Sequence, residues 1–282
     1  MPPLKIDTHQ HFWALNKVEY PWLTPDAGSI YRTFQPHELV PQLIAAGIDK
    51  TVLVQSANNT EDTISMLTQS EAYDWIGAVV GWVPLYDHTR MRVLLERYRQ
   101  HPKFRGIRHL IHNESDPDWI IRPDVIDGLR ILAEYDMVFE LVAVYPQHLK
   151  HAPLLCEQVP SLSIVIDHLA KPPIRAREIG GWASQMQAAA VYPNVYAKIS
   201  GLNTAADYAT WGADDLRPYI DFAMQHFGPG RLMFGSDWPV CTLAGDYAKV
   251  WRETNRALAG YPQSTRDAIF GNTAQRIYRI DD

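Results

Sequence analysis

Eight short apolar runs, each followed by a segment with helical periodicity, are the feature that most restricts how this chain can fold. The runs are rich in Val, Ile and Leu and lie at residues 4–9, 51–55, 76–83, 104–110, 138–145, 163–169, 195–201 and 231–237. Runs of this kind are typical of parallel strands that are covered on both faces. We therefore predict a parallel sheet with helices packed against it.

The predicted helices carry apolar residues three and four positions apart. They include residues 36–46, 61–73, 89–101, 122–135, 147–158 and 214–227. Eight strand–helix units in 282 residues match the size of a (β/α)8 barrel. An open doubly wound sheet would show a glycine-rich loop after its first strand, and this sequence has none there. We predict one α/β domain over residues 1–282, folded as a (β/α)8 TIM barrel.

A long irregular segment follows the first predicted strand, at about residues 12–35. It contains Tyr-Pro-Trp-Leu at residues 20–23, before the first predicted helix. In a TIM barrel, the loops after the strands form the active-site face. We expect this segment to lie over the mouth of the barrel.

Charge and composition argue against nucleic-acid and membrane partners. The net charge is −6, no run of Lys and Arg is present, and no apolar run approaches the roughly 20 residues of a membrane span. Residues 1–5 lack the pattern of a secretory signal, and Cys156 and Cys241 form no disulfide framework. A disulfide between these two cysteines stays open. We expect a cytoplasmic protein.

Polar residues gather where four of the predicted strands end. They are His9 and His11 after the first strand, Arg108, His109 and His112 after the fourth, His168 and Lys171 after the sixth, and Asp237 after the eighth. The carboxyl ends of barrel strands meet on one face, which carries the active site in enzymes of this fold. We therefore expect these side chains to converge.

His9 and His11 are two positions apart, so on a strand both rings would point the same way. Two such rings can hold a divalent metal, or they can polarise a substrate and a water without one. Glu140 and Lys198 add charges to the fifth and seventh strands. A charge inside the barrel needs a partner or a metal, so Glu140 is either paired with Lys198 or part of the site.

These motifs together resemble the amidohydrolase superfamily, in particular its amidohydrolase 2 branch of sugar-lactone hydrolases of the L-fuconolactonase and L-rhamnonolactonase type. The resemblance covers essentially the whole chain. It rests on Asp-Thr-His-Gln-His-Phe-Trp at residues 7–13, Tyr-Pro-Trp-Leu at 20–23, Gly-Ile-Arg-His at 106–109, Asp-His-Leu-Ala-Lys-Pro at 167–172 and Gly-Ser-Asp-Trp-Pro at 235–239. It implies hydrolysis of a cyclic ester by a site built from His9, His11, His168 and Asp237.

One departure from the superfamily concerns the metal. Many members carry a metal-binding His or a modified Lys after strand four or five, whereas residues 138–145 offer Glu140 and Tyr145 but no His. We do not expect a full two-metal site. Two alternatives stay open: one divalent metal, zinc or manganese, held by His9, His11, Asp237 and Glu140, or catalysis without a metal.

Opening a lactone needs an attacking water, a base to accept its proton, and groups that stabilise the oxyanion. Asp237 is the predicted base, and His168 with the His9 and His11 pair would polarise the carbonyl or orient the water. We predict that Arg108, His109, His112 and Lys171 bind the sugar hydroxyls. The apolar face of the ring would pack on Trp22, Trp82 and Trp238.

The favoured function is therefore a hydrolase that opens a sugar lactone in carbohydrate catabolism, as a monomer or homodimer. One alternative is a metal-dependent decarboxylase or another hydrolase of the same branch. Another is a barrel without catalytic activity that binds a sugar or serves as a subunit contact.

Overall fold

The computed structural model describes residues 3–281, so the ends of the predicted domain at 1 and 282 lie outside the described residues. Within this part of the chain, eight parallel strands form one sheet in the order of the sequence. They are β1 Ile6–Gln10, β2 Lys50–Val54, β3 Ile76–Gly81, β4 Phe104–His109, β5 Val138–Leu141, β6 Ile164–Ile166, β7 Val195–Ile199 and β8 Leu232–Phe234.

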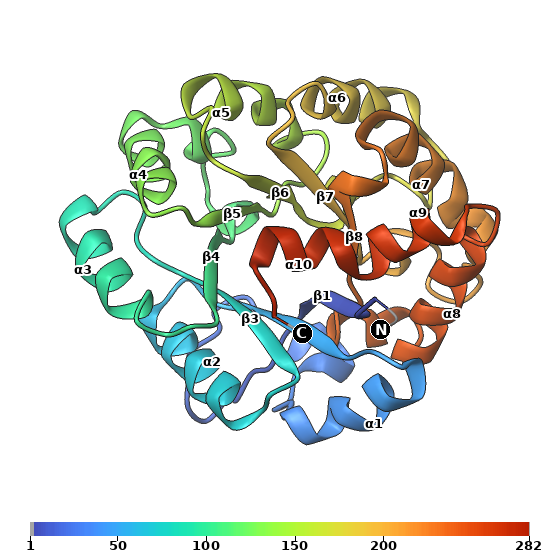
Figure 1. Ribbon diagram of the computed structural model, residues 1–282, viewed down its shortest axis with the longest axis horizontal. Helices are drawn as coiled ribbons and strands as arrows, with labels where there is room; N and C mark the ends of the chain where they lie inside the picture. The colour runs from blue at the N-terminus through green and yellow to red at the C-terminus, as the bar shows by residue number, and fades with distance from the viewer. Residues whose placement is uncertain (1–2, 282) are drawn as a thin grey trace.

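Helices surround the strands, as Figure 1 shows in a view along the barrel. They are α1 Pro36–Ala46, α2 Thr60–Ala72, α3 His88–Tyr98, α4 Pro123–Glu134, α5 Ala152–Gln158, α6 Gly180–Ala190, α7 Ala213–Phe227, α8 Tyr247–Ala257, α9 Gln263–Asp267 and α10 Thr273–Tyr278. The predicted alternation of strands and helices is confirmed, and the fold is a (β/α)8 TIM barrel.

The barrel closes between its first strand and the segment that follows its last. The backbone N–H of Asp237 donates to the carbonyl of His9 at 2.7 Å, and that of His11 donates to the carbonyl of Trp238 at 2.7 Å. Gln10 and Trp238 form a parallel bridge. This seam joins two motifs that are more than 220 residues apart in the sequence.

Alternation along each strand separates two cores. On β2, Val52 and Val54 belong to the cluster inside the barrel, whereas Leu53 packs outward against the helices. Side chains of a strand alternate between its faces, and here both faces are buried. This explains why the strands read as near-continuous apolar runs in the sequence.

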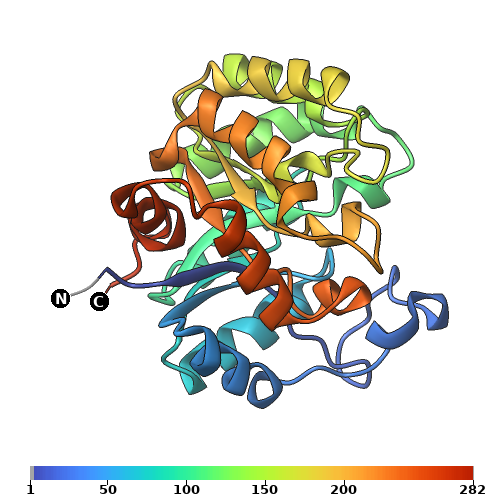
Figure 2. The ribbon, with the colours of Figure 1, turned by 90° about the vertical axis from the view of Figure 1, so that its right-hand side faces the viewer.

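The short helix α10 covers the amino-terminal end of the barrel and lies across the centre of Figure 1. Its residues Ala274 and Tyr278 share the inner cluster with Ile6 and Met233. In Figure 2, α10 lies on one side of the molecule, and the segment of residues 12–35 lies on the other. An antiparallel bridge between Trp13 and Phe34 joins the two ends of this segment.

Three strands end at least three residues earlier than the apolar runs predict. The runs at 138–145, 163–169 and 231–237 become the short strands β5, β6 and β8. After β6 and β8 the backbone turns into the left-handed region, with φ of 55° at His168 and 59° at Asp237. Hydrophobicity continues past this point, but a left-handed backbone cannot continue a strand.

Two further observations concern the described residues as a whole. None of their helices has the length and apolar character that crossing a membrane requires. Cys156 and Cys241 are free thiols, and both are buried.

Candidate active site

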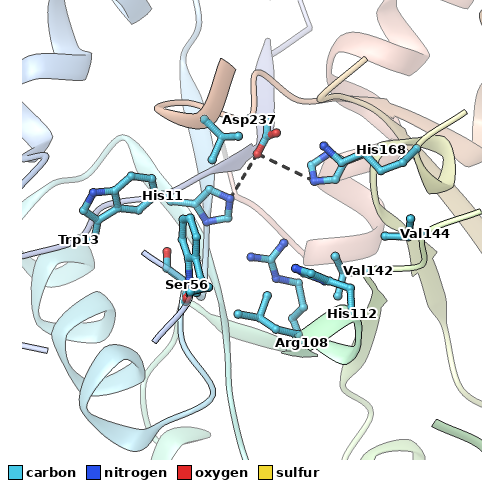
Figure 3. Close-up of a pocket in the computed structure, with 13 residues that line it drawn as sticks. His11, Trp13, Ser56, Arg108, His112, Val142, Val144, His168 and Asp237 are labelled. Carbon is cyan, nitrogen blue, oxygen red and sulfur yellow. Dashed lines mark hydrogen bonds and ion pairs between the residues drawn. The ribbon is translucent and has the colours of Figure 1, made fainter. Parts of the chain in front are cut away.

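A cavity of about 190 Å³ opens at the carboxyl ends of the strands, on the face predicted to carry the site (Figure 3). Most of its exposed lining is apolar, and a few charged or polar groups converge in it. The lining residues are His11, Trp13, Trp22, Ser56, Arg108, Leu110, His112, Val142, Val144, His168, Lys171, Asp237 and Val240. A largely apolar cavity with a few convergent polar groups is typical of a small-molecule site.

Asp237 lies between two histidines on one wall of the cavity (Figure 3). Its Oδ1 is 3.5 Å from His11 Nε2 and 3.9 Å from His168 Nε2, and its Oδ2 has no hydrogen-bond partner among residues 3–281. Burial by itself raises the pKa of this carboxyl, but the interactions with His168, His11 and Lys171 outweigh it and hold the pKa below its usual range. Asp237 is therefore ionised at neutral pH.

Both histidines are fixed by a bond at the far side of the ring. His11 Nδ1 is 2.8 Å from the carbonyl of Val54, which can only accept, so Nδ1 carries the proton and the neutral ring presents the Nε2 lone pair to Asp237. His168 Nδ1 is 2.8 Å from Ser200 Oγ. Burial lowers the pKa of His168 to about 3 and also lowers that of His11, so both rings are neutral at pH 7.

A strained turn presents His168 to the cavity. The four residues from His168 to Lys171 all have φ between 47° and 60°. This conformation costs of the order of 1–3 kcal/mol for each residue with a side chain and is common at functional sites. Gly201 at φ +57° completes the wall, because a Cβ there would lie 2.7 Å from His168 Nδ1 and 2.9 Å from Asp237 Oδ2.

Arg108 reaches the cavity from the end of β4, opposite Asp237 (Figure 3). Its guanidinium donates to the carbonyl of Gln55 and to Asp167 Oδ2 at 3.0 Å, and it lies 3.1 Å from His9 Nε2. Arg108 is only 3% exposed. These bonds fix a buried positive charge at the floor of the cavity.

The structure brings together seven of the residues predicted for the site. His11, His168, Asp237, Arg108, His112, Lys171 and Trp22 all line the cavity. His9 lies just beneath, with its Nε2 3.8 Å from Asp237 Oδ1. Glu140 is deeper still and pairs with Lys198 at 2.6 Å, so it is not next to His11 as the predicted metal group requires.

Three predicted substrate-binding residues lie outside the cavity. His109 accepts a hydrogen bond from Trp82 Nε1 at 3.0 Å, contacts Glu114 at 2.7 Å and stacks on Trp119. Trp238 packs against Phe12 and Phe34. His109 and Trp238 each adjoin a residue that does line the cavity, Arg108 or Asp237. On β4, neighbours face opposite sides, so His109 points away from the cavity when Arg108 points into it. Trp238 follows the left-handed turn at Asp237, which directs the two side chains apart. The prediction placed both members of each pair in the site, whereas the structure places only Arg108 and Asp237 in the lining of this cavity.

Sequence reasoning also missed Trp13, Ser200 and Gly201. Trp13 lines the cavity and continues the spacing of His9 and His11, so the same alternation could have identified it. Ser200 and Gly201 act on His168 across the space between two strand ends. No local pattern in the sequence reveals that contact.

The donor set fits one divalent metal. His9, His168 and Asp237 each offer a ligand atom, and these atoms lie within 4.8 Å of one another. Neutral imidazoles and an ionised carboxylate are the protonation states that a metal requires. The unpartnered Oδ2 of Asp237 and the Nε2 lone pair of His11 add two further free donors beside the group.

The chain matches the amidohydrolase family over residues 6–280. An L-fucono-1,5-lactonase from Burkholderia ambifaria is 38% identical over 98% of this chain and 96% of its own length, and one from Burkholderia multivorans is 33% identical over 100% and 98%. The crystal structure of a Burkholderia multivorans amidohydrolase with bound zinc has a TM-score of 0.91 at 31% identity and covers 99% of this chain and 100% of its own. This chain therefore belongs to the amidohydrolase family, as its motifs predicted.

Proposed function

We propose that the protein opens the ring of a sugar lactone, an aldonolactone such as L-fuconolactone, to give the aldonic acid. The observation that carries the proposal is the ionised Asp237 between His11 and His168, facing the Arg108 guanidinium across a small, largely apolar cavity. Hydrolysis of a cyclic ester needs a base on one side of the carbonyl carbon and positive charge on the other. The similarity to two L-fucono-1,5-lactonases supports this choice of substrate.

Asp237 and His11 would together hold the attacking water. Both present lone pairs to the same space, because His11 carries its proton on Nδ1. A water that donates one hydrogen to each would direct its oxygen lone pair at the carbonyl carbon. The proton then moves to Asp237 as the bond between the water oxygen and the carbon forms.

Arg108 would stabilise the negative charge that develops on the carbonyl oxygen. Its guanidinium is already fixed by Asp167 and by the carbonyl of Gln55, so little reorganisation is needed during the reaction. Collapse of the tetrahedral intermediate breaks the bond between the carbon and the ring oxygen. The proton on Asp237 then passes to the leaving alkoxide, and the carboxylate is restored.

The rest of the cavity suits a polyol ring. Lys171 and His112 offer polar groups to the hydroxyls, and Trp22 and Trp13 offer an apolar surface to the ring face. Trp22 is held by a hydrogen bond from its Nε1 to the carbonyl of Ser56 at 2.6 Å, and Trp13 by one to the carbonyl of Arg32 at 2.7 Å. The segment of residues 12–35 thus supplies the aromatic side of the site.

A divalent metal, zinc or manganese, is included in the proposal as a cofactor that His9, His168 and Asp237 would hold, with His11 adjacent. When bound, it would supply Lewis acidity toward the carbonyl or the water. The zinc in the related crystal structure supports this ion. Location in the cytoplasm and assembly as a monomer or homodimer stay predictions.

A pH-indicator assay over a panel of aldonolactones tests the proposal. The panel contains L-fucono-, L-rhamnono-, L-galactono- and D-arabinono-lactones, each with and without a chelator. We expect turnover of at least one lactone well above spontaneous hydrolysis, and the Asp237→Asn protein serves as the matched control. Turnover that survives chelation would leave the side chains acting alone, and turnover restored by zinc or manganese would assign the metal.

Absence of turnover on every lactone would refute the proposal. The alternative is then a metal-dependent decarboxylase, for which one observation speaks: Arg108 and Lys171 both line the cavity and could bind a substrate carboxylate. Carboxylated aromatic substrates added to the panel, with release of carbon dioxide measured, separate the two activities.

A further inference from the structure

A second group of metal-type ligands lies beneath the cavity. His9, Glu140 and Asp167 each offer a ligand atom, and these atoms lie within 4.8 Å of one another. All three side chains are fully buried, on β1, on β5 and directly after β6. We call them the deep triad. Buried carboxylates at this spacing repel each other unless a cation lies between them.

The cation in the deep triad is the ammonium of Lys198, which is itself fully buried. Its Nζ lies 2.6 Å from Glu140 Oε1, 3.1 Å from His9 Nδ1 and 3.4 Å from Asp167 Oδ1. It therefore contacts every member of the triad. A divalent metal bound to these donors would have to occupy the same space.

The charges around the ammonium are already balanced. When both are ionised, Glu140 and Asp167 contribute two negative charges, and Lys198 and Arg108 contribute two positive ones, since Arg108 donates to Asp167 Oδ2 at 3.0 Å. A divalent ion added to these four groups would leave two uncompensated positive charges in a fully buried site. Such burial is strongly unfavourable.

We propose that Lys198 is an internal counter-cation that takes the place of a metal ion in the deep triad. The barrel then has two groups of metal-type donors, one beside the cavity and the deep triad beneath it. Of these two, the group beside the cavity, which includes His168 and Asp237, would bind the exchangeable divalent ion. The deep triad would then bind no metal in the wild-type protein. This difference in metal binding does not depend on the identity of the substrate or on lactonase activity.

The donors would stay in place without the lysine. The hydroxyl of Tyr278 on α10 holds Glu140 Oε1 at 2.5 Å, and Arg108 holds Asp167 Oδ2. Among the described residues, Glu140 Oε2 and Asp167 Oδ1 accept no hydrogen bond, and His9 Nδ1 lies 3.3 Å from Asp167 Oδ1, so the donors of the triad face one another. Removal of the lysine side chain should therefore convert the deep triad into a true metal site.

Metal counting on the wild-type protein and on the Lys198→Ala variant tests the proposal. Each protein is dialysed against a chelator and then saturated with zinc, and the bound ion is counted by mass spectrometry of the digested sample. We expect at most one equivalent in the wild type and one additional equivalent in Lys198→Ala. Loading with Co²⁺ should add a visible absorption band, which reports coordination by nitrogen and oxygen ligands.

Two matched variants locate the additional ion. Lys198→Arg keeps the positive charge and should bind as many ions as the wild type. In the Lys198→Ala background, Asp167→Asn removes one ligand and should abolish the additional equivalent. Circular dichroism establishes that each variant is folded.

Two results would overturn the proposal: a second tightly bound equivalent in the wild type, or a folded Lys198→Ala protein with no gain over the wild type. If Lys198→Ala does not fold, the wild-type count still decides, because two bound ions would mean that the deep triad accepts a metal despite the lysine. A protein without lactonase activity would give the same metal counts.

Discussion

The two halves of the barrel interior differ sharply in chemistry. The amino-terminal half is apolar, and Ile6, Val52 and Met233 share one cluster there with Ala274 and Tyr278 of α10. The carboxyl-terminal half holds buried charges, among them Arg108, Asp167 and Asp237, and the Glu140–Lys198 pair lies between the two halves, in contact with Tyr278 of α10.

The same eight strands build both halves, so the difference comes from the side chains and not from the architecture. Apolar burial in the amino-terminal half stabilises the fold. The carboxyl-terminal half contains paired charges and left-handed turns, which burial alone does not favour. Stability and chemistry are thus separated along the barrel axis. Mutations in the apolar half should mainly lower stability, and mutations in the charged half should mainly lower activity.

The largest effect on activity is expected from Asp237→Asn. The amide keeps the shape of the side chain but cannot accept the proton of the water, so kcat/KM should fall by about 10²- to 10⁴-fold. The folded structure should be retained, as followed by circular dichroism. Retention of more than a tenth of the wild-type kcat/KM on a lactone would show that Asp237 is not the base.

Met233→Ala is the counterpart in the apolar half. Met233 is fully buried in the inner cluster, and truncation of a buried methionine removes about 2–5 kcal/mol from the free energy of unfolding. We expect this loss in urea denaturation, with kcat on the lactone close to the wild-type value. A large loss of kcat in a folded protein would mean that the two halves are coupled.

A smaller effect should separate two neighbouring histidines. His112 lines the cavity, whereas His109 stacks on Trp119 outside it. Loss of one substrate hydrogen bond weakens binding by about 0.5–1.5 kcal/mol, so His112→Ala should raise KM by up to about tenfold. His109→Ala should leave KM nearly unchanged. Equal increases in KM for both variants would contradict this placement of the substrate.

The smallest effect is expected from pH. The catalytic form needs His11 and His168 neutral, and a neutral histidine is lost as the pH falls through its pKa. Burial lowers the pKa of both histidines, to about 3 for His168. The acid side of the pH profile of kcat/KM should therefore lie below the ordinary histidine range. For protein freed of metal by a chelator, kcat/KM should be level between about pH 6 and about pH 8. A limb centred near the ordinary histidine value of about 6.5 would place a protonatable, solvated histidine in the site.

The barrel itself was accessible from the sequence because its signal repeats. Eight apolar runs separated by amphipathic segments predict the strand order, and errors at the ends of single runs do not change it. The overestimated runs at 163–169 and 231–237 fail for one shared reason. Their last residues adopt a left-handed backbone that hydrophobicity does not encode, as at His168 and Asp237.

The candidate site was partly accessible. The positions of His11, His168, Asp237 and Arg108 follow from the rule that barrel strands end at the active face. The direction of His109 does not, because assigning it to a strand end ignores the alternation of faces. That of Trp238 does not either, because it follows the left-handed turn at Asp237. The pairing of Glu140 with Lys198 was one of two interpretations, and only the approach of these two side chains inside the barrel, from β5 and β7 on either side of β6, decides between them.

The seam between β1 and the segment after β8 has a consequence for the timing of activity. His11 and Asp237 lie on opposite sides of this seam and are joined only when the barrel has closed. A nascent chain cannot assemble the proposed base and its partner histidine until the last strand has folded against the first. The enzyme would thus be inactive until the barrel has closed, and the first turnover would mark the completion of folding.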